Sequence, residues 1–276
     1  MNKIFKEHIL ESSQLLNKIN SKKIKIIDCR WYLNNQKKGY EEYLKSHILN
    51  SIFFDLEKYS NSDSQLPHML PSEKQFKTFV TEMGISKNNE IIIYDQTGFF
   101  CSSRVWFIFK YFKFKSIKIL NGGFQDWFKK KYPVSKIVIK SKKNNQKIVA
   151  KKNMVIEKKE IEKKLLSNKK TLILDARPKK RFYGYEKEPR KDVKNGNIPG
   201  SLNIPFDKIS SKNGKLLSFE KLNKIFEEKI PFSKTKEIIC TCGSGITACN
   251  LIFVLDLLKY KKYKLYDGSW AEWGKK

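Results

Sequence analysis

Arginine is scarce in this sequence. Of its 57 basic residues only five are arginine, at positions 30, 104, 177, 181 and 190, and the remainder are lysines spread along the chain. Sites that read nucleic acids favour arginine, whose planar guanidinium makes bidentate contacts. We therefore interpret the formal charge of +29 as a solvated lysine surface and expect no nucleic-acid partner. The few positions that do hold arginine are expected to need its geometry.

Long apolar runs are absent. Runs such as Leu251–Val254 are far too short to cross a bilayer. The stretch from Met1 to His8 mixes charges with isolated apolar residues, so it does not resemble a secretory signal. These observations predict a soluble, cytoplasmic protein with no membrane partner, which we expect to be a monomer.

The cysteines form neither a disulfide framework nor a zinc motif. They are five in number, an odd count, and no Cys-x-x-Cys pair is present; they stand at positions 29, 101, 240, 242 and 249. Three scattered histidines add no metal-ligand spacing. We expect neither a metal nor an organic cofactor. Most of these cysteines are interpreted as small buried side chains in a reducing compartment.

The two halves of the chain repeat the same landmarks at a spacing of about 147 residues. Each half has an apolar run ending in Asp-x-Arg, a second apolar run followed by a glycine-containing turn, and an aromatic segment. The paired segments are Ile26–Arg30 with Ile173–Arg177, Glu90–Asp95 with Glu237–Cys242, and Asn121–Trp127 with Asp267–Trp273. This order predicts a tandem duplication.

Strand-like and helix-like stretches alternate in both halves. The expected helices are 72–83, 102–112, 219–228 and 246–259. Alternation of this kind predicts an α/β fold with a parallel sheet flanked by helices in each half. Residues 136–153 are rich in lysine and asparagine and contain no glycine or proline, which indicates an extended linker packed on the surface. The predicted domains are therefore 1–135 and 154–276.

Cys242 lies at the start of a glycine-rich turn between a predicted strand and a predicted helix. Such a turn directs backbone N–H groups and a helix N-terminus into one small space. A cysteine there gains stabilisation of its thiolate. Gly243 and Gly245 let the turn curl and let a ligand approach the backbone. The alternative, a buried structural cysteine, suits Cys240 and Cys249 better than Cys242.

The first half lacks this nucleophile. Its counterpart of Cys242 is Asp95, followed by Gln-Thr-Gly-Phe-Phe. The first copy therefore keeps the strand and the turn without the thiol. We expect one inactive domain, within 1–135, and one catalytic domain, within 154–276.

With these motifs the chain resembles the tandem-rhodanese sulfurtransferases. The resemblance rests on both Asp-x-Arg motifs, Leu66–Pro71, Arg181–Phe182, Glu188–Arg190, Gly200–Pro205, the Cys242 loop and Asp267–Trp270. It implies two rhodanese-like domains and a persulfide carried on Cys242. The sequence Cys-Gly-Ser-Gly-x-Thr-Ala is similar to the branch that uses 3-mercaptopyruvate, whereas the thiosulfate branch has basic residues at the positions of Gly243 and Ser244.

The resemblance also implies where the donor binds. Arginines matching Arg181 and Arg190 hold the carboxylate and keto oxygens of 3-mercaptopyruvate in that branch, which agrees with the bidentate chemistry of guanidinium groups. The alternative is an ion pair with Glu186 or Glu188. Arg30 and Arg177, which occur in both halves, are interpreted as structural.

Ser244 and His47 are the candidates for proton transfer that the resemblance suggests. His47 stands in Ser-His-Ile-Leu-Asn, where relatives more often have His-Ile-Pro-Gly, and Asn34–Gly39 upstream contains no aspartate. The serine's alternative role is a hydrogen bond to the bound sulfur, and the histidine's is packing. The loop residues Gly243, Gly245, Ile246 and Thr247 are expected to line the bound sulfur, and Thr247 is also a candidate helix cap.

The sequence therefore predicts a sulfurtransferase that passes sulfur from 3-mercaptopyruvate through Cys242 to a thiol or cyanide, releasing pyruvate. A thioredoxin-like protein is one possible thiol acceptor. Three alternatives remain: a thiosulfate-specific enzyme, a Cys-x5-Arg phosphatase and a non-catalytic binding module. The phosphatase is disfavoured because Ala248 occupies the arginine position. The binding module is disfavoured because the tryptophans fall in repeated or apolar segments.

Overall fold

The computed structural model describes residues 3–167, 171–230 and 237–276, and within them the chain divides into two compact units. The first unit comprises the residues up to Asp63 together with Leu70–Lys151 and Ser210–Leu216. The second comprises Ser64–Met69, Lys152–Ile209 and Leu217–Lys276. The domain ranges 1–135, 136–153 and 154–276 stay a prediction from the sequence.

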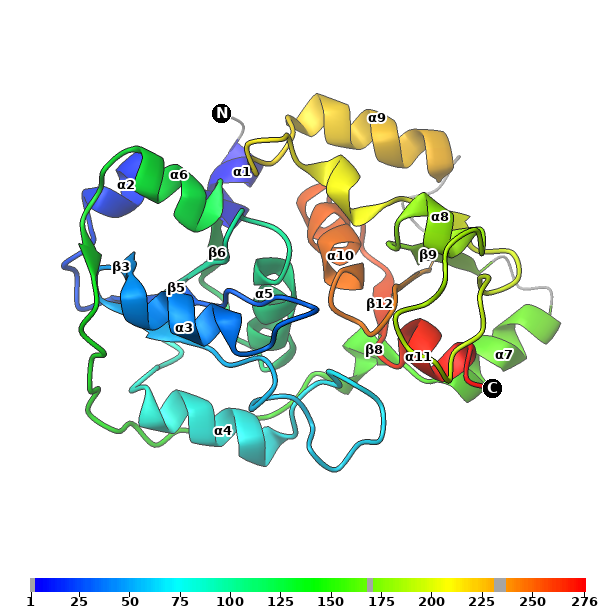
Figure 1. Ribbon diagram of the computed structural model, residues 1–276, viewed down its shortest axis with the longest axis horizontal. Helices are drawn as coiled ribbons and strands as arrows, with labels where there is room; N and C mark the ends of the chain where they lie inside the picture. Colours follow the sequence, from blue (N-terminus) through cyan, green and yellow to red (C-terminus); the bar gives the residue numbers. More distant parts are fainter. Residues whose placement is uncertain (1–2, 168–170, 231–236) are drawn as a thin grey trace. The chain divides into compact units, whose positions relative to one another are not determined.

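Each unit is built on a five-stranded sheet whose neighbouring strands are all parallel (Figure 1). The order in the first unit is β1-β6-β5-β2-β4, and in the second it is β8-β12-β11-β9-β10. Replacing each strand of the first order by its counterpart gives the second, so the duplication predicted from sequence is confirmed in the topology.

The elements of the first unit follow one another in strand–helix alternation. Its strands are β1 (Ile9–Leu10), β2 (Ile24–Asp28), β4 (Ser51–Phe53), β5 (Glu90–Tyr94) and β6 (Ile117–Leu120), with an antiparallel pair formed by β3 (His47–Ile48) and β7 (Val134–Ser135). Its helices are α1 (Lys3–His8), α2 (Ser12–Leu16), α3 (Lys38–Lys45), α4 (Glu73–Glu82), α5 (Ser102–Tyr111) and α6 (Gly123–Lys129).

The second unit repeats the scheme. Its strands are β8 (Val155–Ile156), β9 (Leu172–Asp175), β10 (Leu202–Asn203), β11 (Ile238–Thr241) and β12 (Tyr263–Tyr266). Its helices are α7 (Lys158–Leu166), α8 (Lys179–Phe182), α9 (Phe219–Lys229), α10 (Ala248–Leu257) and α11 (Ser269–Trp273), with 3-10 turns η1 (Lys152–Met154) and η2 (Phe206–Ile209). No helix of the described ranges is long and apolar enough to cross a membrane.

The four helices expected from the sequence are present. Ser72 caps α4, because its hydroxyl accepts the N–H of Gln75, whose side chain in turn accepts the N–H of Ser72. The fourth, expected over 246–259, is shorter at both ends. Ile246 and Thr247 still belong to the turn, and Lys259 adopts a left-handed φ of 64° that ends the helix.

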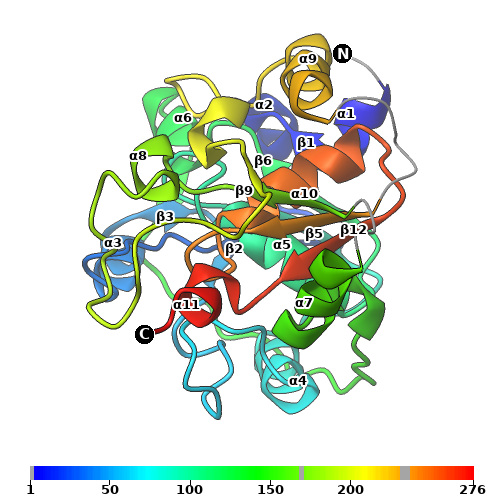
Figure 2. The same ribbon diagram turned by 90° about the vertical axis from the view of Figure 1, so that its right-hand side faces the viewer.

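Helices cover both faces of the second sheet. In Figure 2, α10 lies on one side of the strands and α7 and α11 lie on the other. Successive side chains of a strand point to opposite faces, so Ile239 of β11 packs with Ile161 of α7 and Trp270 of α11. The predicted parallel sheet flanked by helices is therefore confirmed.

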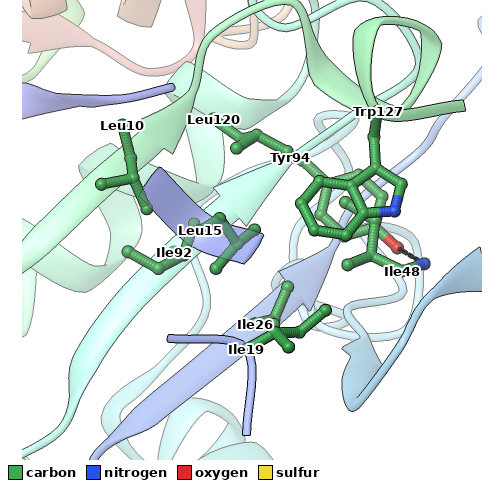
Figure 3. Packing of buried hydrophobic residues seen from close by; sticks show 9 residues of the cluster. All are labelled: Leu10, Leu15, Ile19, Ile26, Ile48, Ile92, Tyr94, Leu120 and Trp127. Atoms are coloured by element: carbon green, nitrogen blue, oxygen red, sulfur yellow. Dashed lines mark hydrogen bonds between the residues drawn. The ribbon is translucent and has the colours of Figure 1, made fainter. Parts of the chain in front are cut away.

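The core of the first unit gathers around Trp127 of α6 (Figure 3). Its indole packs with Ile48 and Tyr94, and Tyr94 also accepts the backbone N–H of Ile48 at 3.1 Å through its hydroxyl. The Trp127 Nε1–H donates to the carbonyl of Pro133 at 3.0 Å. The ring is fully buried and its one polar group is satisfied.

Residues 136–151 form no helix or strand, but they belong to the first unit and are hydrogen-bonded to it. The Asn144 N–H donates to the carbonyl of Thr81, and the Lys151 N–H donates to the carbonyl of Tyr111. Ile148 is buried. These contacts describe a segment laid along the surface of its unit.

Trp127→Ala is expected to lower the free energy of unfolding by about 3–5 kcal/mol, because it leaves a cavity where the indole was fully buried. Phe128→Ala is the matched control: the neighbouring ring is 59% exposed, so its loss should change stability by at most about 0.5 kcal/mol. Urea unfolding followed by circular dichroism measures both. Equal effects would show that the core is not centred on Trp127.

Candidate active site

The loop 242–247 joins β11 to α10, and Cys242 at its start is 2% exposed. The loop is held from one side by Ser269 of α11. The Ser269 hydroxyl accepts the N–H groups of Cys242 and Gly245, both at 3.1 Å, and donates to the carbonyl of Tyr266 at 2.8 Å. Gly245 has a φ of 77°, a left-handed conformation that a β-carbon would strain. The sharp turn therefore needs this glycine.

The remaining N–H groups of the loop have no acceptor. Within the described part of the chain, no acceptor is recorded for the backbone N–H groups of Gly243, Ser244, Ile246, Thr247 and Ala248. Buried or half-buried N–H groups without an acceptor are costly unless a ligand takes them up. The loop is thus a cradle of donors suited to a negatively charged sulfur or oxygen atom.

The first copy of the loop shows such a cradle already filled. The Asp95 carboxylate accepts the N–H groups of Thr97, Gly98, Cys101 and Ser102, with distances of 3.0, 2.7 and 2.9 Å for Thr97, Cys101 and Ser102. These donors are the counterparts, in the repeat, of four positions around the Cys242 loop. An anion therefore sits in the first cradle as part of the chain itself, which explains why the copy without a thiol keeps its loop shape.

Arg177 anchors the segment that carries the candidate donor-binding arginines. Its guanidinium donates to Asp175 through Nε and Nη2, to the carbonyl of Gly196 at 2.8 Å, and to Glu188 at 2.8 Å through Nη1. It also lies over the ring of Trp270, 4.5 Å from the centroid. Burial opposes its charge, but Asp175 and Glu188 outweigh burial and raise the pKa of Arg177. The structural role predicted for this arginine is confirmed.

Arg30 makes the same arrangement in the first unit. It donates to Asp28, including 2.8 Å from Nη2 to Oδ2, and to the carbonyl of Ser46 at 2.7 Å. Its guanidinium lies over the ring of Phe124, 4.3 Å from the centroid. This arginine is structural as well, so both Asp-x-Arg motifs serve the fold.

Arg181 lies against the Cys242 loop. A β-carbon placed on Gly243 would be 3.0 Å from its Nη2 atom, so the guanidinium fills the space that a side chain at that position would need. Nη2 also donates to Glu188 at 2.5 Å. The ion pair weighed as the alternative is therefore present, yet Nε is buried and has no acceptor among the described residues. The Nη2 group of Arg181 is therefore hydrogen-bonded to Glu188, while its Nε–H group can bind a ligand.

Arg190 lies in the field of several charged groups. No hydrogen bond or ion pair is recorded for its guanidinium within the described ranges. Burial lowers the pKa of Arg190, and repulsion by Arg181 lowers it further, while Cys242, Glu188 and Asp192 act in the opposite sense. Two guanidinium groups whose charges act on one another, one of them also on Cys242, suit the binding of a carboxylate.

Among the described residues, the histidine recorded beside Ser244 is His68, and the proton-transfer role of His47 stays a prediction from the sequence. The His68 Nδ1 atom lies 3.0 Å from the Ser244 Oγ atom, and both side chains are buried. His47 lies in the first unit, with Nδ1 2.6 Å from the carbonyl of Tyr43 and Nε2 3.2 Å from that of Ile137. Its ring also stacks on Tyr43 at 4.0 Å. Both nitrogens of His47 are thus engaged by backbone, which fits a packing role.

Sequence reasoning missed two residues of this site, His68 and Ser269, and it weighed an ion pair of Glu188 with Arg181 but not the one with Arg177. His68 stands in Leu66–Pro71 and Ser269 in Asp267–Trp270, two segments already singled out as motifs, so the signal was present but not assigned to a role. Thr247 stands at the N-terminus of α10 but makes no capping hydrogen bond through its side chain. No group of three or more metal-ligating side chains occurs among the described residues.

The model of the rhodanese-like domain matches the chain twice, over residues 11–130 and 158–276. The two matches cover most of the chain and correspond to the two copies of the repeat. With a cysteine in the loop of the second copy, the chain belongs to the rhodanese-like domain family.

Its curated relatives are sulfurtransferases. The chain is 32% identical to a 3-mercaptopyruvate sulfurtransferase of Mus musculus over 257 residues, which is 92% of this chain and 86% of the relative. It is also 32% identical to a thiosulfate sulfurtransferase of Bos taurus, over 91% of this chain and 84% of the relative. The crystal structure of SseA from Escherichia coli, a 3-mercaptopyruvate sulfotransferase, matches with a TM-score of 0.85 and 30% identity, covering 95% and 98% of the two chains.

Asp95→Asn is expected to lower the free energy of unfolding by about 2–3 kcal/mol, because an amide nitrogen would face N–H groups that now meet a carboxylate oxygen. Asp63→Asn changes an exposed carboxylate of the same unit and should be nearly neutral. Chemical denaturation of both variants measures the difference. If Asp95→Asn were as stable as Asp63→Asn, the filled cradle would contribute nothing to the fold.

Proposed function

We propose that this protein transfers sulfur from 3-mercaptopyruvate to a thiol or cyanide through a persulfide on Cys242, releasing pyruvate. The family and the names of the relatives support a sulfurtransferase. The neutral Cys242 loop, with donor N–H groups around one thiol, supports the persulfide.

The observation that favours this donor over thiosulfate is the position of Arg181 against Gly243. A basic residue at 243, as in the thiosulfate branch, would crowd this guanidinium and be repelled by its charge. The site therefore keeps its positive charge on Arg181 and Arg190, beside the loop, where a carboxylate and a keto oxygen can be bound together.

The first half-reaction begins when these two arginines orient the donor. The Cys242 thiolate attacks the thiol sulfur of 3-mercaptopyruvate, and the carbon–sulfur bond breaks with its electron pair moving to carbon. The enolate of pyruvate is stabilised by the arginines and then protonated. Ser244 is hydrogen-bonded to His68, and this pair of side chains passes the proton to the enolate.

In the second half-reaction the free N–H groups of the loop hold the outer sulfur of the persulfide, with Gly243, Ile246 and Thr247 as donors and Gly245 setting the turn. An acceptor thiolate or cyanide then removes this sulfur and regenerates Cys242. A reduced thioredoxin-like protein is a candidate acceptor. No metal or organic cofactor takes part in either step.

We also propose that the protein works in the cytoplasm as a monomer, without a nucleic-acid or membrane partner. The five cysteines, all in the described ranges, are buried and form no disulfide bond, which suits a reducing compartment. The lysine-rich composition supports a solvated surface, because arginine makes up so little of the positive charge.

Thiosulfate is the second candidate donor, favoured by the bovine relative. Pyruvate release from 3-mercaptopyruvate with dithiothreitol, and thiocyanate formation from thiosulfate and cyanide, separate the two. We expect strong turnover in the first assay, weak turnover in the second, and loss of at least about 1,000-fold of activity in Cys242→Ser. Cys249→Ser, at a buried cysteine of α10, is the control. A preference for thiosulfate, or an active Cys242→Ser, would contradict the proposal.

His68→Asn is expected to lower kcat for pyruvate release by about 100-fold and to flatten one limb of its pH profile, because a proton-transfer partner of Ser244 is lost. The matched variant His47→Asn should lower stability but leave the pH profile unchanged, since its ring contacts Tyr43 and two backbone carbonyls. Steady-state rates between pH 5 and 9 measure this. An unchanged profile in His68→Asn would leave that histidine a structural role only.

A further inference from the structure

A pocket of about 320 Å³ opens in the second unit beside the catalytic loop. It is lined by the segment 64–67, by Ala271 and by a charged wall of Arg190, Asp192 and Lys275. The lining combines two cationic side chains, one carboxylate and a few apolar atoms. Arg190 belongs to both this pocket and the proposed donor site, whereas neither Arg181 nor Cys242 lines the pocket.

Three connections place this pocket next to Cys242. The N–H of Ala271 donates to the carbonyl of Gly243 at 2.9 Å, and the N–H of Trp270 donates to the carbonyl of Cys242 at 3.0 Å. The segment 64–67 leads directly to His68, whose ring contacts Ser244. The residues that line the pocket are therefore connected to the catalytic loop directly, through Ala271, and along the chain, through His68.

Backbone hydrogen bonds join the two segments that carry Asp192 and Lys275 of the charged wall. The N–H of Lys276 donates to the carbonyl of Asp192 at 3.0 Å, and the N–H of Lys194 donates to the carbonyl of Gly274 at 2.7 Å. Val193 and Lys275 form a bridge between these two bonds. Within the described residues, no hydrogen bond or ion pair is recorded for the Asp192 carboxylate or the Lys275 ammonium group. Both charged groups line the pocket, and Asp192 also favours the charge of Arg190.

We propose that this pocket binds the sulfur acceptor and that the acceptor is a zwitterionic amino-acid thiol of the size of cysteine. Arg190 and Lys275 take its carboxylate, and Asp192 takes its ammonium group. The inference rests on the proposed function, and it adds the chemical class of the acceptor. Asp192 favours the acceptor over the donor, because cysteine has an ammonium group where 3-mercaptopyruvate has a keto oxygen.

The transfer step balances without another reactant. The acceptor thiolate attacks the outer sulfur of the Cys242 persulfide, and a new sulfur–sulfur bond forms on the acceptor. The bond between that sulfur and Cys242 breaks, and its electron pair returns to Cys242 as the thiolate. The proton given up by the acceptor thiol ends on the outer sulfur of the product persulfide. Pyruvate has already left, so Arg190 is free to bind a second carboxylate.

The test uses full-length protein whose Cys242 has been loaded with sulfur by inorganic polysulfide and then desalted. Discharge is measured with cysteine and with 3-mercaptopropionate, which has the carboxylate and the thiol but no ammonium group. In Asp192→Asn the half-saturating concentration of cysteine should rise about threefold to fivefold, as expected for a solvent-accessible charge pair. That of 3-mercaptopropionate should stay unchanged. Glu186→Gln, at an exposed carboxylate outside the pocket, is the matched control.

Two results would overturn the inference. An equal rise for both thiols would show that Asp192 supports the fold of the wall and does not meet an ammonium group. No change for either thiol would show that the acceptor binds elsewhere. Because Cys242 is loaded with polysulfide, this test does not use 3-mercaptopyruvate. If 3-mercaptopyruvate were not the donor, only the pyruvate assay would fail, and the comparison of the two thiols could still be interpreted.

Discussion

The buried ion pair between Arg177 and Asp175 is the interaction on which the site depends. Both side chains are almost fully buried, and removing one partner of such a pair typically costs about 3–5 kcal/mol. The same guanidinium binds the carbonyl of Gly196 and the carboxylate of Glu188, and Glu188 in turn binds Arg181. A strand end, a loop and Arg181 are thereby fixed to one another, and the Arg181 guanidinium is held against the Cys242 loop.

The duplication shows what the fold requires and what the chemistry adds. Both copies keep the buried arginine over an aromatic ring, the parallel strand order and the turn after the central strand. They differ in what lies at the turn: the first copy supplies its own carboxylate from Asp95, whereas in the second no acceptor is recorded, among the described residues, for five N–H groups. Backbone donors gathered around one thiol suit a bound anion. This contrast supports the proposal that the second copy carries the chemistry.

Periodicity and repetition predicted most of the fold from sequence. The strand–helix alternation gave the parallel sheets, and the repeated landmarks gave two equivalent units, because both are local patterns read along the chain. The contact between His68 and Ser244 joins positions 176 residues apart, and no local pattern encodes it. His47 lies on a strand with neighbours that resemble a known motif, so it attracted the role, whereas His68 lies in an irregular loop with a left-handed φ of 58°. Side-chain pairing across such distances is set by tertiary packing.

With donor and acceptor both bound through Arg190 as proposed, one small site serves two substrates in turn. Burial and Arg181 disfavour the charge of Arg190, whereas Cys242, Glu188 and Asp192 favour it, and a bound carboxylate adds to the favourable side whichever molecule brings it. In a cycle with a covalent intermediate, donor and acceptor are never bound together, and a shared carboxylate site causes no conflict. Discrimination must then come from groups next to the carboxylate. Arg181 faces the catalytic loop, where a keto oxygen gains from a positive charge, and Asp192 stands in the pocket wall, where an ammonium group gains from a negative one.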